Sequence, residues 1–470
     1  MTAMGAAAEA RCAPWLWPRL ESFGDAPAIV HRGAPISYRA LVARTAAFDP
    51  ELSARGIGPG CVVLLEGSYS EGAVALLLAL LRRGAICVPL TPQAAVQREA
   101  FAQIAEVAFR YRFDNDGPGG AERCTFESQP GGQPPLASPL LRRLAALGHP
   151  GLVLFSSGSA GKPKAVLHDC AALLEKFHRP GQRKTTLSFL LFDHIGGIDT
   201  LFNTLSNGGT LVTTPARDPD AVCAAIAAHR VHTLPASPTF LNLLLLSEAH
   251  RRHDLSSLRV LAYGTEPMPA PVLARLRQAL PEAKLVQTYG LSELGVLRTR
   301  SRGESLWLQF SGDGFATQVR DGVLWVKART AMLGYLNAPD LFDADGWLNT
   351  EDAVEVDGEW LRILGRVSDL INVGGRKVYP AEVETVLLQC PNVRDVAVCG
   401  EKNALTGQVV SARFNLVDPE PLDAFKKRLR AFCRDKLPPY KVPARIELTD
   451  RELFSARLKK LRRPDPGGAR

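Results

Sequence analysis

A short stretch between residues 155 and 166 combines small, hydroxyl-bearing and cationic residues in a pattern that suits an anion. It reads FSSGSAGKPKAV and follows an apolar run, residues 151–154, that predicts a buried strand. Glycine lets a backbone approach an anion closely, consecutive N–H groups can form an anion-binding nest, and two lysines add positive charge. The stretch is not a Walker A loop, which needs GxxxxGK followed by Ser or Thr. Taken alone it is equally consistent with a Gly/Ser surface turn, so other segments must decide.

Three further segments place glycine and polar residues directly after an apolar run that predicts a strand. Residues 186–192 are followed by DHIGG at 193–197, residues 260–263 by GTE at 264–266, and residues 284–286 by QTYGLSE at 287–293. Ligands in open α/β sheets bind beyond the carboxyl ends of the strands. The three strand ends therefore predict the walls of one crevice.

The composition of the whole chain limits the possible functions. The chain has 470 residues, enough for more than one domain, and its 46% apolar and 22% charged residues are ordinary for a globular protein. The sequence shows no apolar stretch long enough to cross a bilayer, no secretory signal, and nine scattered cysteines without metal-binding spacing. We therefore expect a cytoplasmic protein without a membrane span.

The charge balance predicts an anionic partner but does not choose one. The net charge is +8, which suits nucleic acid, a nucleotide, coenzyme A or an acidic carrier protein. Aromatic residues are few, and neither a zinc-finger nor an RNA-recognition signature occurs, which argues against nucleic acid.

The elements that must position the crevice follow from the apolar pattern of the N-terminal half. Residues 26–112 alternate short strands with helices at 38–55 and 71–83, which predicts βαβ units and a mostly parallel sheet. The Gly- and Pro-rich residues 113–138 predict a surface loop or linker, and the segment 168–177 predicts a helix.

The pattern changes in the last third of the chain. Residues 323–364 alternate short apolar runs with turns and predict antiparallel β structure. From Val367 onward we expect a small α+β unit with helices at 380–390 and 422–437, the second carrying Lys426, Lys427, Arg430 and Arg434 on its polar face. The predicted fold is thus α/β. It has a large N-terminal domain (residues 1–366) of α/β subdomains plus a small β subdomain, and a small C-terminal α+β domain (residues 367–470).

Four motifs in a fixed order point to one family. FSSGSAGKPKAV at 155–166 is similar to the phosphate-loop motif of that family, and QTYGLSE at 287–293 to its YGxTE motif. NTED at 349–352 stands where the family has TGD, and GRVSDLINVGG at 365–375, continued by YPAEVE at 379–384, is similar to its hinge motif. The chain, from about Ile36 to Arg463, resembles the adenylate-forming superfamily of acyl-CoA synthetases, luciferases and nonribosomal peptide synthetase adenylation domains.

The resemblance implies a site for ATP and Mg²⁺, in which a carboxylate attacks the α-phosphate and expels pyrophosphate. Glu293 is implied as the Mg²⁺ ligand and, with Ser292, as part of the catalytic machinery, because Mg²⁺ prefers oxygen ligands and bridges phosphates. Asp352 would accept hydrogen bonds from the ribose hydroxyls and Arg366 would donate to the same sugar. The remaining implied contacts are Ser156, Ser157, Gly158, Ser159, Gly161 and Lys164 at the phosphates, Gly264, Thr265, Glu266 and Tyr289 around the adenine, and Gln287, Thr288, Gly290 and Ser292 in the same nucleotide site.

Plainer interpretations of two of these residues stay open at this point. Glu293 could be a solvated carboxylate after a turn, and Tyr289 could be a core aromatic whose hydroxyl is satisfied within the protein.

The catalytic lysine of the family lies near the C-terminus in a Gly-Lys-x-x-Arg motif. The corresponding stretch reads ARLKKLRR at 456–463, where Lys459 and Arg462 keep the Lys-x-x-Arg spacing and Leu458 replaces the glycine. Lys459 is the implied catalytic residue, which would stabilise the charge on the pentavalent phosphorus. Lys460 is the alternative, and so is a solvated basic tail without a catalytic role.

Domain movement is a further implication of the hinge motif. Asp369 stands at the hinge position, so the C-terminal domain is expected to be mobile and to pivot there between two half-reactions. Gly374 and Gly375 would then approach the incoming thiol, and Asn372 replaces the lysine common at its position.

The acid substrate is implied only by class. Asp193, His194 and Gly264 fall where the family forms the acid pocket, with His194 as wall or gate, although a structural histidine is the alternative. Asp193 could hold an α-amine as in amino-acid-activating relatives, but the following Gly196-Gly197 does not match their pattern. An acyl or aryl acid without an α-amine is therefore the expected substrate.

Taken together, the sequence predicts a stand-alone AMP-forming acid–thiol ligase. It would use ATP and Mg²⁺ to activate a small carboxylic acid and pass it to coenzyme A or to the phosphopantetheine of a separate acyl or peptidyl carrier protein. No carrier domain follows the lysine motif. Two alternatives stay open. One is transfer to a non-thiol acceptor such as an amine. The other is a non-catalytic nucleotide-binding protein, which the altered NTED motif and Leu458 would support.

Overall fold

A seven-stranded sheet carries the three strand ends that the sequence singled out. The computed structural model describes residues 13–114, 122–157, 163–214, 216–303, 305–455 and 457–462. All neighbours in this first sheet run parallel except the edge strand β2. Its order is β13 (Lys284–Gln287), β12 (Val260–Tyr263), β11 (Thr233–Ala236), β9 (Thr185–Leu187), β10 (Thr210–Val212), β1 (Pro27–His31) and β2 (Ala34–Ser37). The carboxyl ends of β12 and β13 therefore lie side by side, as predicted.

A second seven-stranded sheet carries the phosphate-loop motif on the antiparallel pair β7–β8. Its order is β20 (Gly334–Tyr335), β8 (Pro163–Asp169), β7 (Gly151–Ser157), β4 (Ile86–Leu90), β3 (Val62–Glu66), β5 (Phe109–Asp114) and β6 (Arg123–Ser128). One apolar core joins the two sheets, since Ile29 and Leu211 of the first and Val63 and Leu154 of the second belong to it.

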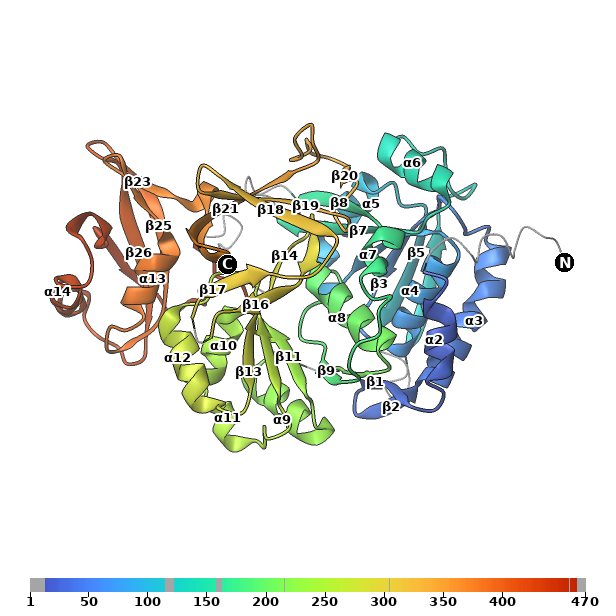
Figure 1. The fold of residues 1–470 in the computed structure, drawn as a ribbon, viewed down its shortest axis with the longest axis horizontal. Coiled ribbons are helices and arrows are strands. Elements are labelled where there is room, and N and C mark those ends of the chain that lie inside the picture. Colours follow the sequence, from blue (N-terminus) through green and yellow to red (C-terminus); the bar gives the residue numbers. More distant parts are fainter. Residues whose placement is uncertain are drawn as a thin grey trace.

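Helices cover the two sheets and fill the space between them (Figure 1). Residues 72–81 of α4 are all buried, which explains why this helix is apolar on every face. Its N-terminus is capped by the Ser70 hydroxyl, which accepts the Ala73 N–H. The helices of the N-terminal part are α2 (Leu16–Ser22), α3 (Tyr38–Ala54), α4 (Glu71–Arg82), α5 (Arg98–Ile104), α6 (Pro139–Leu147), α7 (Cys170–Glu175), α8 (Ile195–Ser206), α9 (Pro219–His229), α10 (Pro238–Leu246), α11 (Ala249–Arg252) and α12 (Ala270–Ala279).

A six-stranded antiparallel sheet follows, as the pattern at 323–364 predicted. Its order is β16 (Thr299–Ser301), β17 (Trp307–Phe310), β22 (Trp360–Arg366), β21 (Leu348–Asp357), β19 (Val323–Ala328) and β18 (Phe315–Arg320), and the small hairpin β14 (Tyr289–Leu291)–β15 (Gly295–Leu297) precedes it in the chain. The pairing of β21 with β22 places Asp352 opposite Arg366.

The residues after Val367 form a separate five-stranded sheet with its own core. This C-terminal part, residues 367–462, extends away from the N-terminal part and is coloured orange to red in Figure 1. Phe414 of the sheet packs against Phe425 of α14, with ring centroids 4.8 Å apart. Its elements are β23 (Ile371–Val373), β24 (Arg376–Val378), α13 (Pro380–Leu387), β25 (Val393–Asn403), β26 (Gly407–Leu416), α14 (Leu422–Cys433) and β27 (Arg445–Leu448).

Several predicted element bounds are wrong. The strand expected at 186–192 ends at Leu187, because the apolar residues beyond it pack against helices instead of a strand. Phe189, for example, lies 4.3 Å from the Phe240 ring. Within the segment expected to be loop, β6 forms an edge strand on β5. The helix expected at 168–177 begins only at Cys170, and the two C-terminal helices end earlier than predicted, at Leu387 and Cys433.

Candidate active site

A cluster of three polar side chains, buried Tyr289 and Asp352 with the partly exposed Arg366, joins the β14 hairpin to the β21–β22 pair. The Tyr289 hydroxyl donates to Asp352 Oδ2 at 2.6 Å, and Arg366 Nε lies 2.9 Å from Asp352 Oδ1. Arg366 also donates to the Thr350 carbonyl at 3.0 Å. Burial raises the pKa of Tyr289 well above its usual range, and the Asp352 carboxylate adds to this shift, so the phenol stays a proton donor. Asp352 is thereby held as a fixed acceptor, with Arg366 beside it.

The Ser292–Glu293 segment is held by contacts from three other strands and loops. The Tyr335 hydroxyl donates to Glu293 Oε1 at 2.6 Å, and the Met332 N–H donates to the Glu293 carbonyl at 2.7 Å. The buried His168 donates from Nε2 to the Ser292 carbonyl at 2.6 Å. Burial lowers the pKa of His168, which keeps the ring neutral. Glu293 is thus presented in a fixed position.

The phosphate-loop residues are described only at the base of their hairpin. Ser156 pairs with Lys164 and Ser157 with Pro163 across β7 and β8. The Lys164 ammonium lies 5.0 Å from the centre of the Tyr335 ring, so this lysine is on the same side as Glu293. Gly158, Ser159 and Gly161 lie outside the described residues.

The end of β12 approaches the end of β13 so closely that Gly264 has no space for a side chain. A Cβ at this position would lie 2.6 Å from Thr288 Oγ1 and 2.8 Å from the Thr288 carbonyl oxygen. Thr265 follows with a φ of +75°, and its hydroxyl is buried without a hydrogen-bond partner within the described part of the chain. The side-chain oxygen of Gln287 is likewise buried and unpartnered there. Unsatisfied polar atoms of this kind at two strand ends fit a site that receives polar ligand groups.

Glu266 and Gly290 contribute in ways that the sequence did not predict. Glu266 Oε1 accepts the Thr239 N–H at the start of α10 at 2.8 Å, and Oε2 accepts the Lys460 N–H at 3.0 Å. The carboxylate therefore joins the N-terminal part to the C-terminal tail. At Gly290 a Cβ would lie 2.9 Å from the Gly295 carbonyl oxygen, so the β14–β15 hairpin requires a glycine.

The tail segment, residues 457–462, returns from the C-terminal part to the ends of β11 and β12. The Leu458 carbonyl accepts a hydrogen bond from Ser237 Oγ at 2.7 Å. Leu458 has a φ of +53°, in the left-handed region that glycine adopts without strain. This conformation explains why a glycine suits the position and supports the alignment of Leu458 with the glycine of the lysine motif.

The two candidate lysines face different surroundings. Burial lowers the pKa of Lys459; the carboxylates of Glu266 and Glu293 oppose this shift, whereas Arg457 and Arg366 add to it. Lys459 is therefore in the electrostatic field of the crevice residues. Lys460 instead forms an ion pair with the buried Asp395 of the C-terminal sheet.

Asp193 and His194 occupy adjacent positions with separate partners. Asp193 Oδ2 accepts from the Thr91 hydroxyl at 3.1 Å and lies 3.3 Å from Arg457 Nη2. His194 caps α8, with Nδ1 accepting the Gly196 N–H at 3.0 Å. Burial, helped by the positive charges of Lys459, Arg457 and Arg217, lowers the pKa of His194 well below its usual value. The imidazole is therefore neutral beside Lys459.

A cavity of about 990 Å³ lies between the 188–192 segment and the C-terminal part. Apolar side chains form much of its wall, and polar groups lie among them. The lining includes Tyr69, Phe189, Leu191, Leu243, Phe454 and Leu458 together with Arg32, Thr91, Arg217 and Arg394. These positions are scattered from residue 31 to residue 458, so no sequence pattern could have found them.

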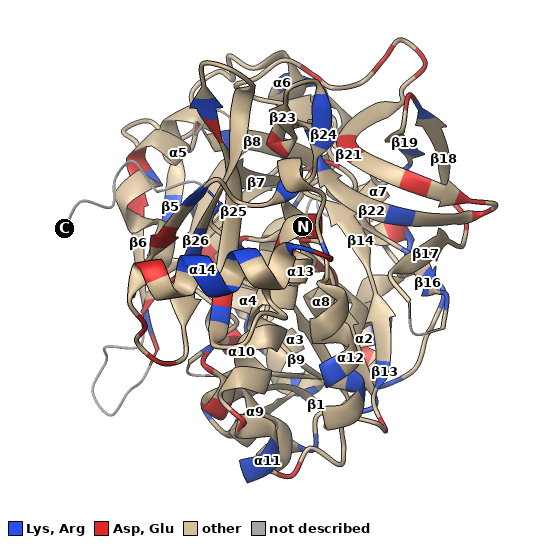
Figure 2. Ribbon diagram, turned by 90° about the vertical axis from the view of Figure 1, so that its left-hand side faces the viewer, with Lys and Arg blue, Asp and Glu red and all other residues tan. Residues whose placement is uncertain are grey.

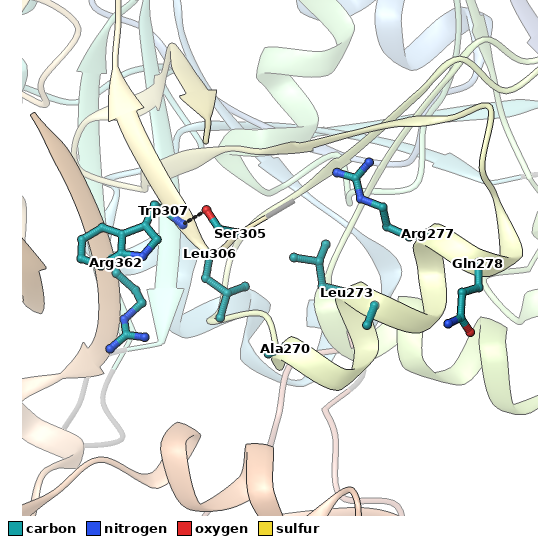
Figure 3. A pocket seen from close by; sticks show the side chains of 9 residues that line it. Ala270, Leu273, Arg277, Gln278, Ser305, Leu306, Trp307 and Arg362 are labelled. Carbon is teal, nitrogen blue, oxygen red and sulfur yellow. Dashed lines mark hydrogen bonds between the residues drawn. The ribbon is translucent and has the colours of Figure 1, made fainter. Parts of the chain in front are cut away.

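A second hollow, of about 460 Å³, lies between α12 and the β17 edge (Figure 3). Leu273 and Arg277 project from α12, and Leu306 and Trp307 form the opposite wall (Figure 3). None of the residues predicted for the site lines this hollow.

The predicted hinge residue contacts the tail segment, and the predicted thiol residues form a turn of the C-terminal sheet. Asp369 Oδ2 pairs with Arg462 Nη1 at 3.4 Å. Gly374 and Gly375 form the exposed turn between β23 and β24, with φ values of +58° and +82°. The Gly375 N–H donates to Asn372 Oδ1 at 2.8 Å, which supports the turn.

Comparisons with known proteins place these features in a family. The family described as AMP-binding enzyme matches residues 16–309, and its C-terminal domain family matches residues 382–460. A feruloyl-CoA synthase of an Amycolatopsis species is 29% identical over 470 residues, covering 93% of this chain and 94% of the relative.

Two solved structures share the fold. One is the o-succinylbenzoate CoA synthetase of Bacillus subtilis in complex with its acyl-adenylate, with a TM-score of 0.74 and 23% identity over 95% of this chain and 96% of that one. The other is an amide bond synthetase of Marinactinospora thermotolerans, with a TM-score of 0.71 and 24% identity over 94% of this chain and 97% of that one. No helix in the described part of the chain is both long and apolar enough to span a membrane. The family match covers more than half of the chain, which therefore belongs to the AMP-binding enzymes, the adenylate-forming superfamily.

Proposed function

We propose that this protein activates a carboxylic acid with ATP to an acyl-adenylate and then transfers the acyl group to the thiol of coenzyme A. The observation that carries the proposal is the position of Lys459. The residues on either side of it are bound at the ends of β11 and β12, since the Leu458 carbonyl accepts from Ser237 and the Lys460 N–H donates to Glu266. A half-buried cation beside a nucleotide crevice is suited to stabilise charge that develops on a phosphate during transfer.

In the first half-reaction a carboxylate oxygen of the acid attacks the α-phosphorus of ATP. The bond from that phosphorus to the bridging oxygen breaks, and pyrophosphate leaves. Lys459 neutralises the α-phosphate oxygens, and Lys164 with Ser156 holds the leaving phosphates. Asp352 accepts from the ribose hydroxyls, because Tyr289 and Arg366 fix its two oxygens in place.

The donor set at Glu293 fits a Mg²⁺ ion that is shared with the phosphates. Mg²⁺ is commonly held in such sites by one or two carboxylates together with substrate phosphates and water. Glu293 supplies the carboxylate, and the Tyr335 hydroxyl fixes its Oε1 atom. When bound there, the ion neutralises charge on the phosphate oxygens.

In the second half-reaction the thiol attacks the acyl carbon of the adenylate and AMP leaves. The β23–β24 turn with Gly374 and Gly375 is exposed in this structure, whereas the tail segment occupies the crevice. Rotation of the C-terminal part near Asp369 would withdraw Lys459 and bring the turn to the crevice. Residues 1–366 and 367–470 are then the two domains that move.

The acid that we propose is aromatic or cyclic and lacks an α-amine. Asp193, the residue that could bind an amine, uses its Oδ2 atom for contacts within the protein, to Thr91 and Arg457. The neutral His194 stands next to it and suits a pocket wall that receives an uncharged ring. The names of relatives, a feruloyl-CoA synthase and a 2-succinylbenzoate–CoA ligase, point to the same class of acid.

Coenzyme A is the acceptor favoured by the relatives and by charge. Lys427, Arg430 and Arg434 are exposed along and just after α14, where Figure 2 shows a row of basic residues. Such a surface suits the phosphates of coenzyme A and also an acidic carrier protein. An amine acceptor is the second candidate, because one structural neighbour is an amide bond synthetase.

A pyrophosphate-release screen tests the proposal. Ferulate, 4-coumarate, 2-succinylbenzoate, anthranilate, hexanoate and decanoate are each supplied with ATP and Mg²⁺, with and without coenzyme A. We expect release with at least one aromatic acid and faster AMP formation when coenzyme A is present. Release that responds to an added amine but not to coenzyme A would favour the amide-forming alternative. ATP binding without release for any acid would contradict the proposal.

A further inference from the structure

Asp193 carries a buried carboxylate that takes no part in either half-reaction as described above. Its side chain is only 3% exposed, and Thr91, its hydrogen-bond donor, is 4% exposed. Oδ2 accepts from Thr91 and faces Arg457, while Oδ1 is buried without a hydrogen-bond partner in the described part of the chain. One neutral hydroxyl does not balance a buried negative charge, so this carboxylate depends on a cation.

The cation comes from the tail segment, two residues before Lys459. Arg457 Nη2 lies 3.3 Å from Asp193 Oδ2, across 264 residues of sequence. Two other basic side chains of the segment pair within the C-terminal part: Lys460 with Asp395, and Arg462 with Glu384 and Asp369. Arg457 therefore differs from them, because its ion-pair partner belongs to the N-terminal part.

Two backbone contacts flank Lys459 on the same segment. The Leu458 carbonyl binds the Ser237 hydroxyl and the Lys460 N–H binds Glu266. Both use main-chain atoms of the tail, so they restrict the chain without depending on its side chains. The Asp193–Arg457 pair adds a side-chain contact on the other side of Leu458. Three contacts within four residues thus hold the lysine in the crevice.

We propose that Asp193 and Arg457 are positioning residues, an ion pair that holds Lys459 in place for adenylation and must open before the thiol-dependent step. This inference rests on the proposed two-step function. The ion pair must open because Arg457 belongs to the tail segment and leaves the crevice together with it. Arg217 then remains as a cation within the N-terminal part, where it lines the same cavity as Thr91, the hydrogen-bond donor to Asp193.

The proposal predicts opposite responses of the two half-reactions. Arg457→Gln and Asp193→Asn should each slow acid-dependent pyrophosphate–ATP exchange by about tenfold, the rate change that corresponds to about 1.4 kcal/mol. In Arg457→Gln, transfer from a synthetic acyl-adenylate to coenzyme A should be unchanged or faster. Arg457→Lys should restore part of the exchange rate. The matched control is Arg230→Gln, which removes an exposed pair with Asp254 of the same 3.3 Å length and should affect neither step.

A second measurement needs no substrate. Hydrogen exchange followed by mass spectrometry should show faster exchange in peptides covering residues 457–462 of Arg457→Gln than in the wild type, with no change in Arg230→Gln. Equal losses in both half-reactions, or unchanged exchange of the tail peptides, would overturn the proposal. Failure of the wild type to release pyrophosphate with any acid would instead contradict the proposed function, and the hydrogen-exchange measurement would still test the ion pair independently.

Discussion

The C-terminal part presents two functional segments in opposite states. The tail segment lies against the N-terminal part through Arg457, Leu458 and Lys460. The β23–β24 turn, with Gly374 and Gly375, is exposed and contacts only its own sheet through the Thr406 carbonyl and Asn372, among the hydrogen bonds of the described residues. The difference teaches that, in this arrangement, the tail segment and not the β23–β24 turn meets the N-terminal part. Under the proposed function, this is the arrangement for adenylation, with the tail segment against the N-terminal part.

The largest expected effect comes from removing the inserted lysine. Lys459→Ala should slow pyrophosphate–ATP exchange by about 100-fold or more, because preorganised charge stabilisation of a transition state is typically worth that much. Transfer from a synthetic acyl-adenylate should fall far less, since the lysine is withdrawn in that step.

Lys460→Ala is the matched comparison. Its ammonium pairs with the buried Asp395, so we expect a lower Tm and a smaller loss of exchange rate than for Lys459→Ala. If Lys460→Ala abolished exchange while Lys459→Ala retained it, the assignment of the two lysines would have to be reversed.

A smaller effect should come from the exposed turn. Gly375 has a φ of +82°, and a side chain there costs about 1–2 kcal/mol in the left-handed region. Gly375→Val should therefore slow transfer to coenzyme A more than it slows pyrophosphate exchange, as measured by separate assays of the two steps.

The control for this strain is Gly322→Val in the β18–β19 turn, where φ is +76° and a Cβ would likewise meet open space. We expect a similar change in Tm and no difference between the two half-reactions. Equal slowing of both steps by Gly375→Val would show that the turn serves stability only.

The smallest expected effect concerns pH. Adenylation needs the protonated Lys459, whose pKa burial has lowered, so the rate should fall as pH rises through this lowered value. The carboxylate of Glu266 opposes the lowering. Glu266→Gln should thus move the alkaline limb of the exchange rate to lower pH. An unchanged or upward-shifted limb would contradict the assignment of that limb to Lys459.

The sequence identified residues that belong to local motifs, because such motifs indicate the chemistry of their residues. Asp352 and Arg366 were assigned to one sugar, and they face each other across β21 and β22. Glu293 was assigned to the metal and phosphates, and the Tyr335 hydroxyl and the Met332 N–H hold it in place. Such motifs can be recognised in a sequence because the crevice is formed by strand ends, where a few adjacent residues carry the chemistry.

Supporting residues were missed because their partners are remote in the sequence. Tyr335 reaches Glu293 across 42 residues and His168 reaches Ser292 across 124. Tyr289 was expected beside the adenine, yet its hydroxyl binds Asp352, a contact that the motif could not indicate. A buried tyrosine or histidine has no pattern of its own that distinguishes a supporting role from ordinary packing.

By itself the sequence determined the α/β architecture, the order of the motifs and the Lys-x-x-Arg spacing of Lys459 and Arg462. These features depend on local periodicity and on residue type. Only the tertiary structure decided that Lys460 pairs with Asp395 of the C-terminal sheet, that Glu266 binds the tail, and that Asp193 pairs with Arg457. Neighbouring residues of the tail have different partners, because Leu458 lies in a turn and because the partners are set by how two separately folded sheets meet. That arrangement depends on contacts between residues that are hundreds of positions apart in the sequence, and no local pattern indicates such contacts.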